Sequence, residues 1–245
     1  MQIALSTWLE VEDYLRRSRG IIVPIGSTEQ HGPTGLIGTD AICAEVIARR
    51  VGDLAQSMVG PTLPVGMAVH HMAFPGTITL RPSTLMLVIR DYVTSLARHG
   101  FQRVFFVNGH GGNAPSLRAA FYEIYAETMA EGETRVRCAM VNWWEAPEVQ
   151  ALLQELFGQE EGSHATPGEV SVTQCAYPDQ VRDVVLTPQV APTGGIHDPE
   201  DFRRRFPDGR IGSNPALASP EHGRRLTETA ARAIAAQYLA FAAEI

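Results

Sequence analysis

Two continuous apolar runs constrain the fold of this chain more than any other feature. They are GIIVPIG at residues 20–26 and RVFFVNG at residues 103–109, and both end in glycine. A run without polar alternation is typical of a parallel strand that is covered on both faces. Amphipathic stretches follow each run, and strands that alternate with helices favour a mostly parallel sheet between two helix layers. We therefore expect a three-layer α/β/α fold and a single domain over residues 1–245.

Helices and further strands are predicted from apolar periodicity and from terminal signals. Thr7 and Glu10 form a capping-box pattern at the start of the first helix, and Thr39 is expected to cap the second. Residues 186–219 are rich in proline and glycine and show no period, so we expect a long loop that contacts a subunit or the site. The predicted helices cover residues 7–18, 39–54, 83–99, 114–130, 147–157, 168–176 and 221–243, and the predicted strands cover residues 20–26, 58–66, 103–109, 135–144 and 181–185.

Composition argues against several classes of partner. The 245 residues carry a formal net charge of −7, whereas a nucleic-acid partner would require a basic face. No apolar run approaches the ~20 residues of a membrane span, and the first residues lack the pattern of a signal peptide. The three cysteines are odd in number and far apart, which indicates reduced thiols in a cytoplasmic protein.

The loop PIGSTEQHGPTGLIGTD follows the first apolar run and concentrates three metal-capable side chains. Glu29 and His31 offer an oxygen and a nitrogen ligand, and Asp40 stands where the next helix is expected to begin. Two carboxylates and an imidazole together suit a divalent transition metal. A simpler interpretation makes Glu29 an exposed carboxylate, His31 a turn residue and Asp40 an acidic residue that the helix dipole favours.

The second motif, NGHGGN, spans residues 108–113 at the end of the second apolar run. Ligands gather outside the carboxyl ends of the strands in open α/β sheets, so this loop and the first one are expected to converge. His110 then becomes a further candidate ligand, although a strand-end histidine can also serve in hydrogen bonding alone. The glycine spacing is a weak match to a dinucleotide-binding fingerprint.

The third motif, SHATPGEVSVT, spans residues 163–173. Glu169 falls in the first turn of a predicted helix, whose dipole keeps a carboxylate ionised, as a metal ligand or a base requires. A plain first-turn glutamate is the simpler alternative. His164 lies in the more flexible part of the motif, where a histidine can carry a proton at neutral pH. No nucleophile elbow surrounds a serine, and no cysteine lies in a motif, so we expect no covalent nucleophile.

The segments GSTEQHGP, HxxFPGTITL, NGHGGN and SHATPGEVSVT together resemble the motifs of the creatininase (creatinine amidohydrolase) family. They occur in the same order and extend over about residues 20–177. The resemblance implies an α/β fold with a central parallel sheet, two divalent Zn, Mn or Fe ions per subunit, and hexamers built as a trimer of dimers. It also implies hydrolysis of a cyclic or other non-peptide C–N amide bond in a small molecule.

Metal-binding roles follow from the resemblance by motif position. Glu29 and His110 would bind one metal ion, His31 would bind the other, and Asp40 would bridge both. The creatinine-hydrolysing members resemble NGHYEN at the second motif, and the glutamate of that sequence is a ligand. This chain has Gly112 at the same position, which puts creatinine itself in doubt as the substrate.

The glutamate of the third motif can replace the missing ligand, so we place Glu169 on the second metal together with His31 and Asp40. Trp144 stands where the creatinine-hydrolysing branch carries a tryptophan that covers the substrate, although a strand-end tryptophan is often part of the core. His71 and Asn113 are also expected to contact the substrate.

The expected mechanism uses a hydroxide, formed from water between two close cations, to attack the amide carbonyl, while His164 gives a proton to the leaving nitrogen. Three reactions stay open: opening of a creatinine-type lactam, deformylation of a formamidopyrimidine nucleotide, and trimming of a peptide-derived cofactor precursor. A non-catalytic oligomer that keeps the metal as a structural element is an alternative from another class.

The sequence contains one run of basic residues, which comprises Arg203, Arg204, Arg205 and Arg210. We expect it to be a solvated loop, or else a subunit contact or a clamp for an anionic substrate.

Overall fold

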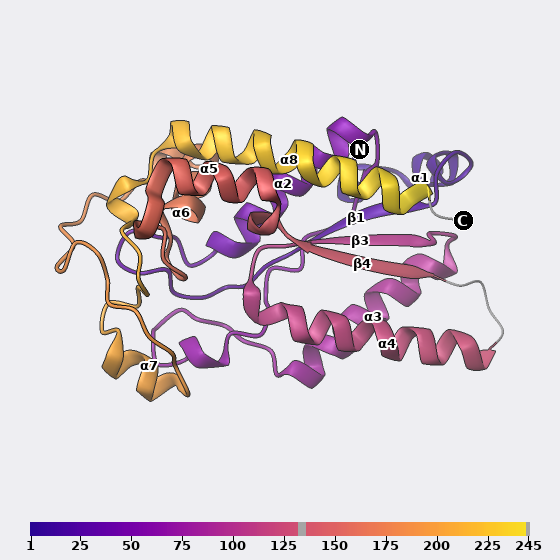
Figure 1. Cartoon of the computed structure of the whole chain (residues 1–245). Helices are drawn as coiled ribbons and strands as arrows, with labels where there is room; N and C mark the ends of the chain where they lie inside the picture. Colours follow the sequence, from indigo (N-terminus) through magenta and orange to yellow (C-terminus); the bar gives the residue numbers. More distant parts are fainter. Residues whose placement is uncertain (132–135, 244–245) are drawn as a thin grey trace.

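A four-stranded parallel sheet forms the centre of the molecule, in a computed structural model that describes residues 1–131 and 136–243 (Figure 1). Ile25, Asn108 and Asn142 pair across the last rung of the sheet, so three strands end at one edge. The loops after these strands therefore meet at the same place. The strand order is β2-β1-β3-β4, with β1 at Gly20–Ile25, β2 at Met58–Val59, β3 at Arg103–Asn108 and β4 at Arg137–Asn142.

The described residues form eight α-helices: α1 (Trp8–Leu15), α2 (Thr39–Ala55), α3 (Pro82–Arg98), α4 (Ala114–Glu131), α5 (Pro147–Phe157), α6 (Pro167–Ala176), α7 (Pro199–Arg205) and α8 (Pro220–Ala243). Helices α2, α5, α6 and α8 cover one face of the sheet, and α3 and α4 cover the other (Figure 1). Successive side chains of a strand point to opposite faces of the sheet, so alternate residues pack against different helix layers. Ile22 packs in the first layer, whereas Ile21 and Val23 pack in the second. The predicted three-layer α/β/α fold is confirmed.

Most of the predicted helices and strands are found within about one turn of their expected ends. The capping box of α1 is confirmed, because Thr7 and Glu10 exchange both of its hydrogen bonds. The predicted cap of α2 is wrong: Gly38 is the cap residue, and the Thr39 hydroxyl donates to the Leu36 carbonyl. The predicted fourth strand began at residue 135, which lies outside the described residues. No described helix combines the length and the hydropathy needed to cross a membrane.

Two strand predictions need correction. Residues 181–185 form no strand and are exposed, with Val185 at 91% of its full accessibility, so its valines lack the buried neighbours that stabilise a strand. The strand predicted over residues 58–66 shortens to β2. Pro61 and Pro64 have no backbone N–H to donate, so the ladder cannot continue through them.

The segment 186–219 is not the structureless loop that its composition predicts. It contains α7, which the Asp198 side chain caps by accepting from the Asp201 backbone N–H, and it buries Phe202. Arg210 is fully buried, in contrast to the predicted solvated run. It pairs with Asp208 and donates to the carbonyls of Pro188, Gln189 and Ser213. All of these contacts join residues of the segment itself, so they stabilise its fold from within.

Candidate metal centre

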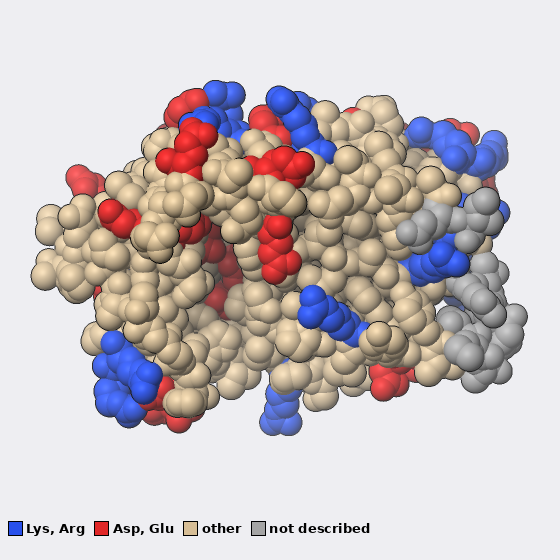
Figure 2. Space-filling model, in the orientation of Figure 1, with Lys and Arg blue, Asp and Glu red and all other residues tan. Residues whose placement is uncertain are grey.

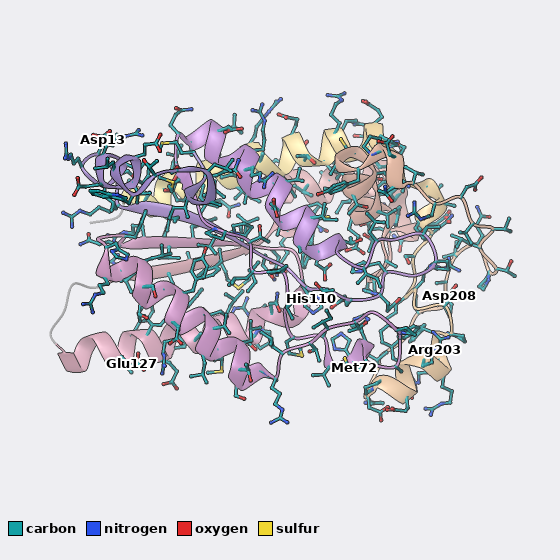
Figure 3. All side chains as sticks on the ribbon, turned by 180° about the vertical axis from the view of Figure 1, so that it is seen from behind. Asp13, Met72, His110, Glu127, Arg203 and Asp208 are labelled. Atoms are coloured by element: carbon teal, nitrogen blue, oxygen red, sulfur yellow. The ribbon has the colours of Figure 1, made fainter. Side chains whose placement is uncertain are left out.

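A cavity of about 760 Å³ opens at the carboxyl ends of β1 and β3, and residues of all three sequence motifs line it. Figure 2 shows acidic side chains at the bottom of a hollow in this part of the molecule. In Figure 3, His110 lies beyond the strand ends, toward the part of the chain that carries Asp208. Among the described residues, the lining includes four carboxylates but no lysine or arginine, so the cavity is electronegative.

Asp40 lies at the centre of the polar cluster. Its Oδ1 is 3.0 Å from His31 Nε2, and its Oδ2 is 3.1 Å from His110 Nδ1. The side chain is buried in the first turn of α2, where the positive end of the helix dipole stabilises a carboxylate. His31 Nδ1 lies 3.1 Å from the Glu29 carbonyl, and donation to this acceptor leaves Nε2 free to face Asp40.

Glu29 is also buried, and several neighbours hold its carboxylate. Oε2 accepts a hydrogen bond from Ser27 Oγ at 2.7 Å and lies 3.3 Å from His110 Nε2. Oε1 lies 3.0 Å from His71 Nε2. The loop after β1 therefore points this carboxylate inward, and the interpretation of Glu29 as an exposed loop residue is wrong.

Glu169 occupies the third position of α6, where it completes a capping box with Thr166. Its Oε1 accepts from the Thr166 backbone N–H, and its backbone N–H donates to the Thr166 hydroxyl. This use of Oε1 turns Oε2 toward His31 Nε2, at 3.7 Å. The sequence TPGE carries the capping-box signal that would have placed the helix start one residue earlier than predicted.

Two donor triads share Asp40. One contains Glu29, Asp40 and His110, and the other contains His31, Asp40 and Glu169, with the potential ligand atoms of each within 4.8 Å of one another. Mixed carboxylate and imidazole donors suit Zn and Mn. Glu29 Oε1 and Asp40 Oδ2 are buried and accept no hydrogen bond of acceptable geometry from the described residues. These unsatisfied oxygens fit a site that holds cations.

The charges of the cluster point to the same conclusion. Burial by itself would lower the pKa of His31, but Asp40 and Glu169 outweigh burial and raise it well above its usual value. Burial likewise opposes the charged form of His110, but Glu29 and Asp40 raise its pKa to about 9. Burial would raise the pKa of Asp40, and His31 and His110 lower it instead. The carboxylates therefore attract positive charge into a buried space.

His164 and His71 lie beside the cluster, and the centroid of the His164 ring is 4.6 Å from that of His31 and 4.5 Å from that of His71. His164 Nδ1 lies 3.9 Å from Glu29 Oε1, and its Nε2 lies 2.8 Å from the Gln30 carbonyl. The segment 186–219 holds His164 in place, because Ser213 Oγ donates to its carbonyl. Burial lowers the pKa of both histidines below the usual value, and neighbouring histidines lower each one further.

The residues predicted to bind substrate divide into two groups. Trp144 and His71 line the cavity, and Trp144 is partly exposed there. Asn113 occupies a different place: its buried amide donates to the Gly26 carbonyl and accepts from the Met67 N–H. Asn113 is not among the residues that line the cavity, so its side chain holds two loops together.

Sequence reasoning missed several residues of the cavity wall. Phe202 comes from the segment 186–219, and Glu161 comes from the turn before the third motif. His70 lines the cavity beside His71 because residues 69–71 form a 3₁₀ turn. Gln30 contacts both His71 and His164. Gln30 stands between two candidate ligands, Glu29 and His31, in the sequence, and this position could have identified it as a residue of the site.

A parallel sheet that delivers carboxylates and imidazoles to one electronegative cavity is typical of a metal-dependent α/β hydrolase. Comparison with known proteins defines the class further. The family model for creatinine amidohydrolase matches residues 4–238. The chain therefore belongs to the creatininase family of hydrolases.

Individual relatives resemble the chain to different extents. It is 26% identical over 242 residues to the creatinine amidohydrolase of Pseudomonas putida, and the match covers 94% of this chain and 92% of the relative. It is 38% identical over 116 residues to the mycofactocin precursor peptide peptidase of Mycobacterium ulcerans, which covers 44% of this chain and 46% of the relative.

Solved structures confirm the fold. A mutant creatininase complexed with creatine has a TM-score of 0.86 at 27% identity, over 96% of both chains. A creatininase with Mn has a TM-score of 0.85 at 25% identity, over 99% of both chains.

Proposed function

We propose that this protein is a dinuclear metal-dependent amidohydrolase that cleaves a non-peptide C–N bond, such as that of a creatinine-type lactam or a related small amide. The position of Asp40 carries the proposal, because its two oxygens face different histidines and it belongs to two donor triads. A carboxylate shared in this way is suited to bridge two ions. When bound, two such ions polarise a carbonyl oxygen and supply hydroxide near neutral pH.

The donor triads assign a set of ligands to each ion. Glu29 and His110 would hold one ion, His31 and Glu169 would hold the other, and Asp40 would hold both. Zn, Mn and Fe all accept this mixture of oxygen and nitrogen donors. The manganese named for a related solved creatininase supports the assignment of a divalent transition metal.

His164 would carry the proton to the leaving nitrogen. Its Nε2 lies at the Gln30 carbonyl, and its Nδ1 is directed toward the carboxylates of the cavity. Burial and the neighbouring His31 and His71 lower the pKa of His164 well below its usual value, so its ring is neutral. Trp144 and His71 would position the substrate at the cavity wall.

The basic side chains near the cavity discriminate among the candidate substrates. In addition to the two proposed ions, a phosphorylated formamidopyrimidine would require a basic side chain to bind its phosphate, and the described lining contains no lysine or arginine. An amide without a phosphate group suits this lining. The second candidate function is trimming of a precursor peptide. The size of the cavity and the 38% identity with the mycofactocin precursor peptide peptidase favour it.

The proposal also covers the domain organisation, the oligomeric state and the cellular location of the protein. We infer one domain over residues 1–245 that assembles as a homo-oligomer, with the family hexamer as the expected form. Exposed apolar side chains support contact with further copies, because Leu5 is 80% and Trp8 is 72% exposed. The three cysteines are free thiols, which fits the reducing cytoplasm. The open cavity argues against a purely structural metal site, which protein ligands would close.

A substrate panel tests the proposal. The chelated protein would be reloaded with Zn or Mn and incubated with creatinine, other lactams, formamides and short peptides. Metal-dependent lactam opening that a His164→Asn variant reduces is the expected result. Cleavage of the peptides alone would support the second candidate. Hydrolysis of none of these compounds by the metal-loaded protein would favour the non-catalytic alternative.

A further inference from the structure

The side chain of Gln30 lies between two histidines of the cavity wall and is almost fully buried. Its Nε2 lies 3.0 Å from His71 Nδ1, 2.9 Å from His164 Nε2 and 3.0 Å from the Gly209 carbonyl. Its Oε1 accepts a hydrogen bond from the Gly32 N–H at 2.9 Å. One amide group thus contacts both histidines and two loops.

Two backbone groups fix the orientation of this amide. The Gly32 N–H can only donate, and the Gly209 carbonyl can only accept. A flipped amide would place its NH₂ group against an N–H and its oxygen against a carbonyl, so both hydrogen bonds would be lost. The amide nitrogen is therefore the atom that faces the two histidines.

The Gln30 backbone carbonyl determines the tautomer of His164. This carbonyl lies 2.8 Å from His164 Nε2 and has no hydrogen to offer, so Nε2 must carry the proton. A protonated Nε2 cannot also accept from the Gln30 amide. His164 Nδ1 keeps its lone pair and lies 3.9 Å from Glu29 Oε1, on the cavity side.

The remaining amide hydrogen of Gln30 is left for His71. Because Nδ1 accepts this hydrogen, it carries no proton of its own, and the ring proton of His71 lies on Nε2. Nε2 lies 3.0 Å from Glu29 Oε1, where an unprotonated nitrogen would set two lone pairs against each other. This assignment of hydrogens satisfies the contacts to the Gly209 carbonyl, to His71 Nδ1 and to the Gln30 carbonyl, and it leaves Gln30 Nε2 and His164 Nε2 as neighbouring donors 2.9 Å apart.

We propose that Gln30 is a positioning residue that sets the two histidines to opposite tautomers. Its side chain fixes the proton of His71 on Nε2, the nitrogen that lies beside the Glu29 carboxylate, and its backbone carbonyl fixes His164 as an acceptor at Nδ1. Only the consequence for the reaction rate rests on the proposed function. His71 would hold the Glu29 carboxylate in place, and His164 would be ready to take up a proton.

The segment 186–219 belongs to the same arrangement. Gly209 has a φ of +87°, and a Cβ added there would lie 1.9 Å from Gln30 Oε1. Only glycine combines this backbone conformation with so close an approach. The glycine therefore allows the Gly209 carbonyl to accept the second hydrogen of the Gln30 amide.

Ring ¹⁵N spectra of the zinc-loaded, histidine-labelled protein test the proposal, with a His71→Gln variant to assign the signals. In the wild type, we expect His71 to be protonated on Nε2. In Gln30→Glu, a carboxylate oxygen faces His71 Nδ1, so the proton of His71 should move to Nδ1. His164 should keep its tautomer in the same sample, because the backbone carbonyl is unchanged. Gln180→Glu, at an exposed glutamine that does not line the cavity, is the matched control and should alter neither ring.

Kinetics provide a second measurement. Loss of the hydrogen bond from Gln30 to His71 in Gln30→Glu should lower kcat roughly 10–100-fold with little change in KM, as for other residues that orient metal ligands. A wild-type His71 protonated on Nδ1 would overturn the proposal, whether or not an activity is found and even if the Gln30 variants do not fold. A Gln30→Met protein that has lower Tm but unchanged His71 signals and kcat would also overturn it, because Gln30 would then serve only to pack the segment 186–219.

Discussion

The backbone of Gly112 lies directly against the ring of His110. A Cβ placed at residue 112 would be 2.4 Å from His110 Nε2 and 2.7 Å from the Met67 carbonyl, which itself lies 2.9 Å from that ring nitrogen. No side chain fits there unless the ring moves. The chain therefore has no room for a ligand at the position of the glutamate in NGHYEN, and Glu169 is the carboxylate that faces His31 instead.

Substitution of Gly112→Ala should displace the His110 ring and weaken binding at the ion assigned to Glu29 and His110. We expect metal affinity to fall roughly 10–100-fold, the size of effect seen when the groups that orient a metal ligand are changed. Metal titration calorimetry measures this loss. Gly111→Ala is the matched control, because a Cβ there meets its nearest neighbour, Trp144, only at 4.0 Å. Equal metal affinity in the two variants would contradict the clamped position of His110.

Glu169→Gln should remove one of the two ions that we propose while leaving the fold intact. The substitution also weakens the capping box with Thr166, an effect worth about 1 kcal/mol. Glu10→Gln changes the equivalent residue of the capping box in α1 and has no contact with the cavity. We expect a similar small fall in Tm in both variants, but a loss of metal, by elemental analysis, only in Glu169→Gln. If Glu169→Gln retained both ions, Glu169 would not be a ligand.

Glu161 should make the stability of the metal-free protein depend on pH. Burial and the neighbouring Glu169 raise the pKa of this carboxyl from 4.5 to about 8. The folded state therefore holds the proton more tightly than the unfolded chain. This contribution to stability is complete below about pH 4.5 and is lost as the pH rises through about 8.

Glu161→Gln removes this ionisation, so its Tm relative to wild type should rise with pH across that interval. A pKa shift of this size corresponds to roughly 5 kcal/mol when it is fully expressed, and each 1 kcal/mol changes Tm by about 2–4 °C for a chain of this length. Bound metal should reduce the effect, because it neutralises Glu169. Parallel plots of Tm against pH for the two metal-free proteins would show that Glu161 titrates normally.

Local patterns in the sequence were sufficient to predict most of the fold and the centre of the site. Apolar runs predicted β1 and β3, and the alignment of parallel strand ends brought Asp40 and His110 together as expected. Short loops after buried strands leave few positions for polar side chains. For this reason, Glu29 and His31 could be placed before any contact was known.

The rest depended on contacts between distant residues. Phe202 and Arg210 become buried because segment 186–219 folds over the third motif, and neither a seven-residue helix nor a buried arginine leaves a periodic signal. Residues 181–185 have the composition of a strand but lack a neighbour to pair with. Asn113 lies in a cavity motif, yet its amide is occupied by the backbone of two other loops.

Metal content per chain in the wild type and in Asp40→Asn provides the most direct measurement. The substitution keeps the shape of the side chain and removes the charge that the two donor triads share. Protein purified without chelator should contain close to two divalent ions per chain, and Asp40→Asn should lose both while remaining folded by circular dichroism. A wild type with a single ion, or an Asp40→Asn variant that retains two, would contradict a centre bridged by Asp40.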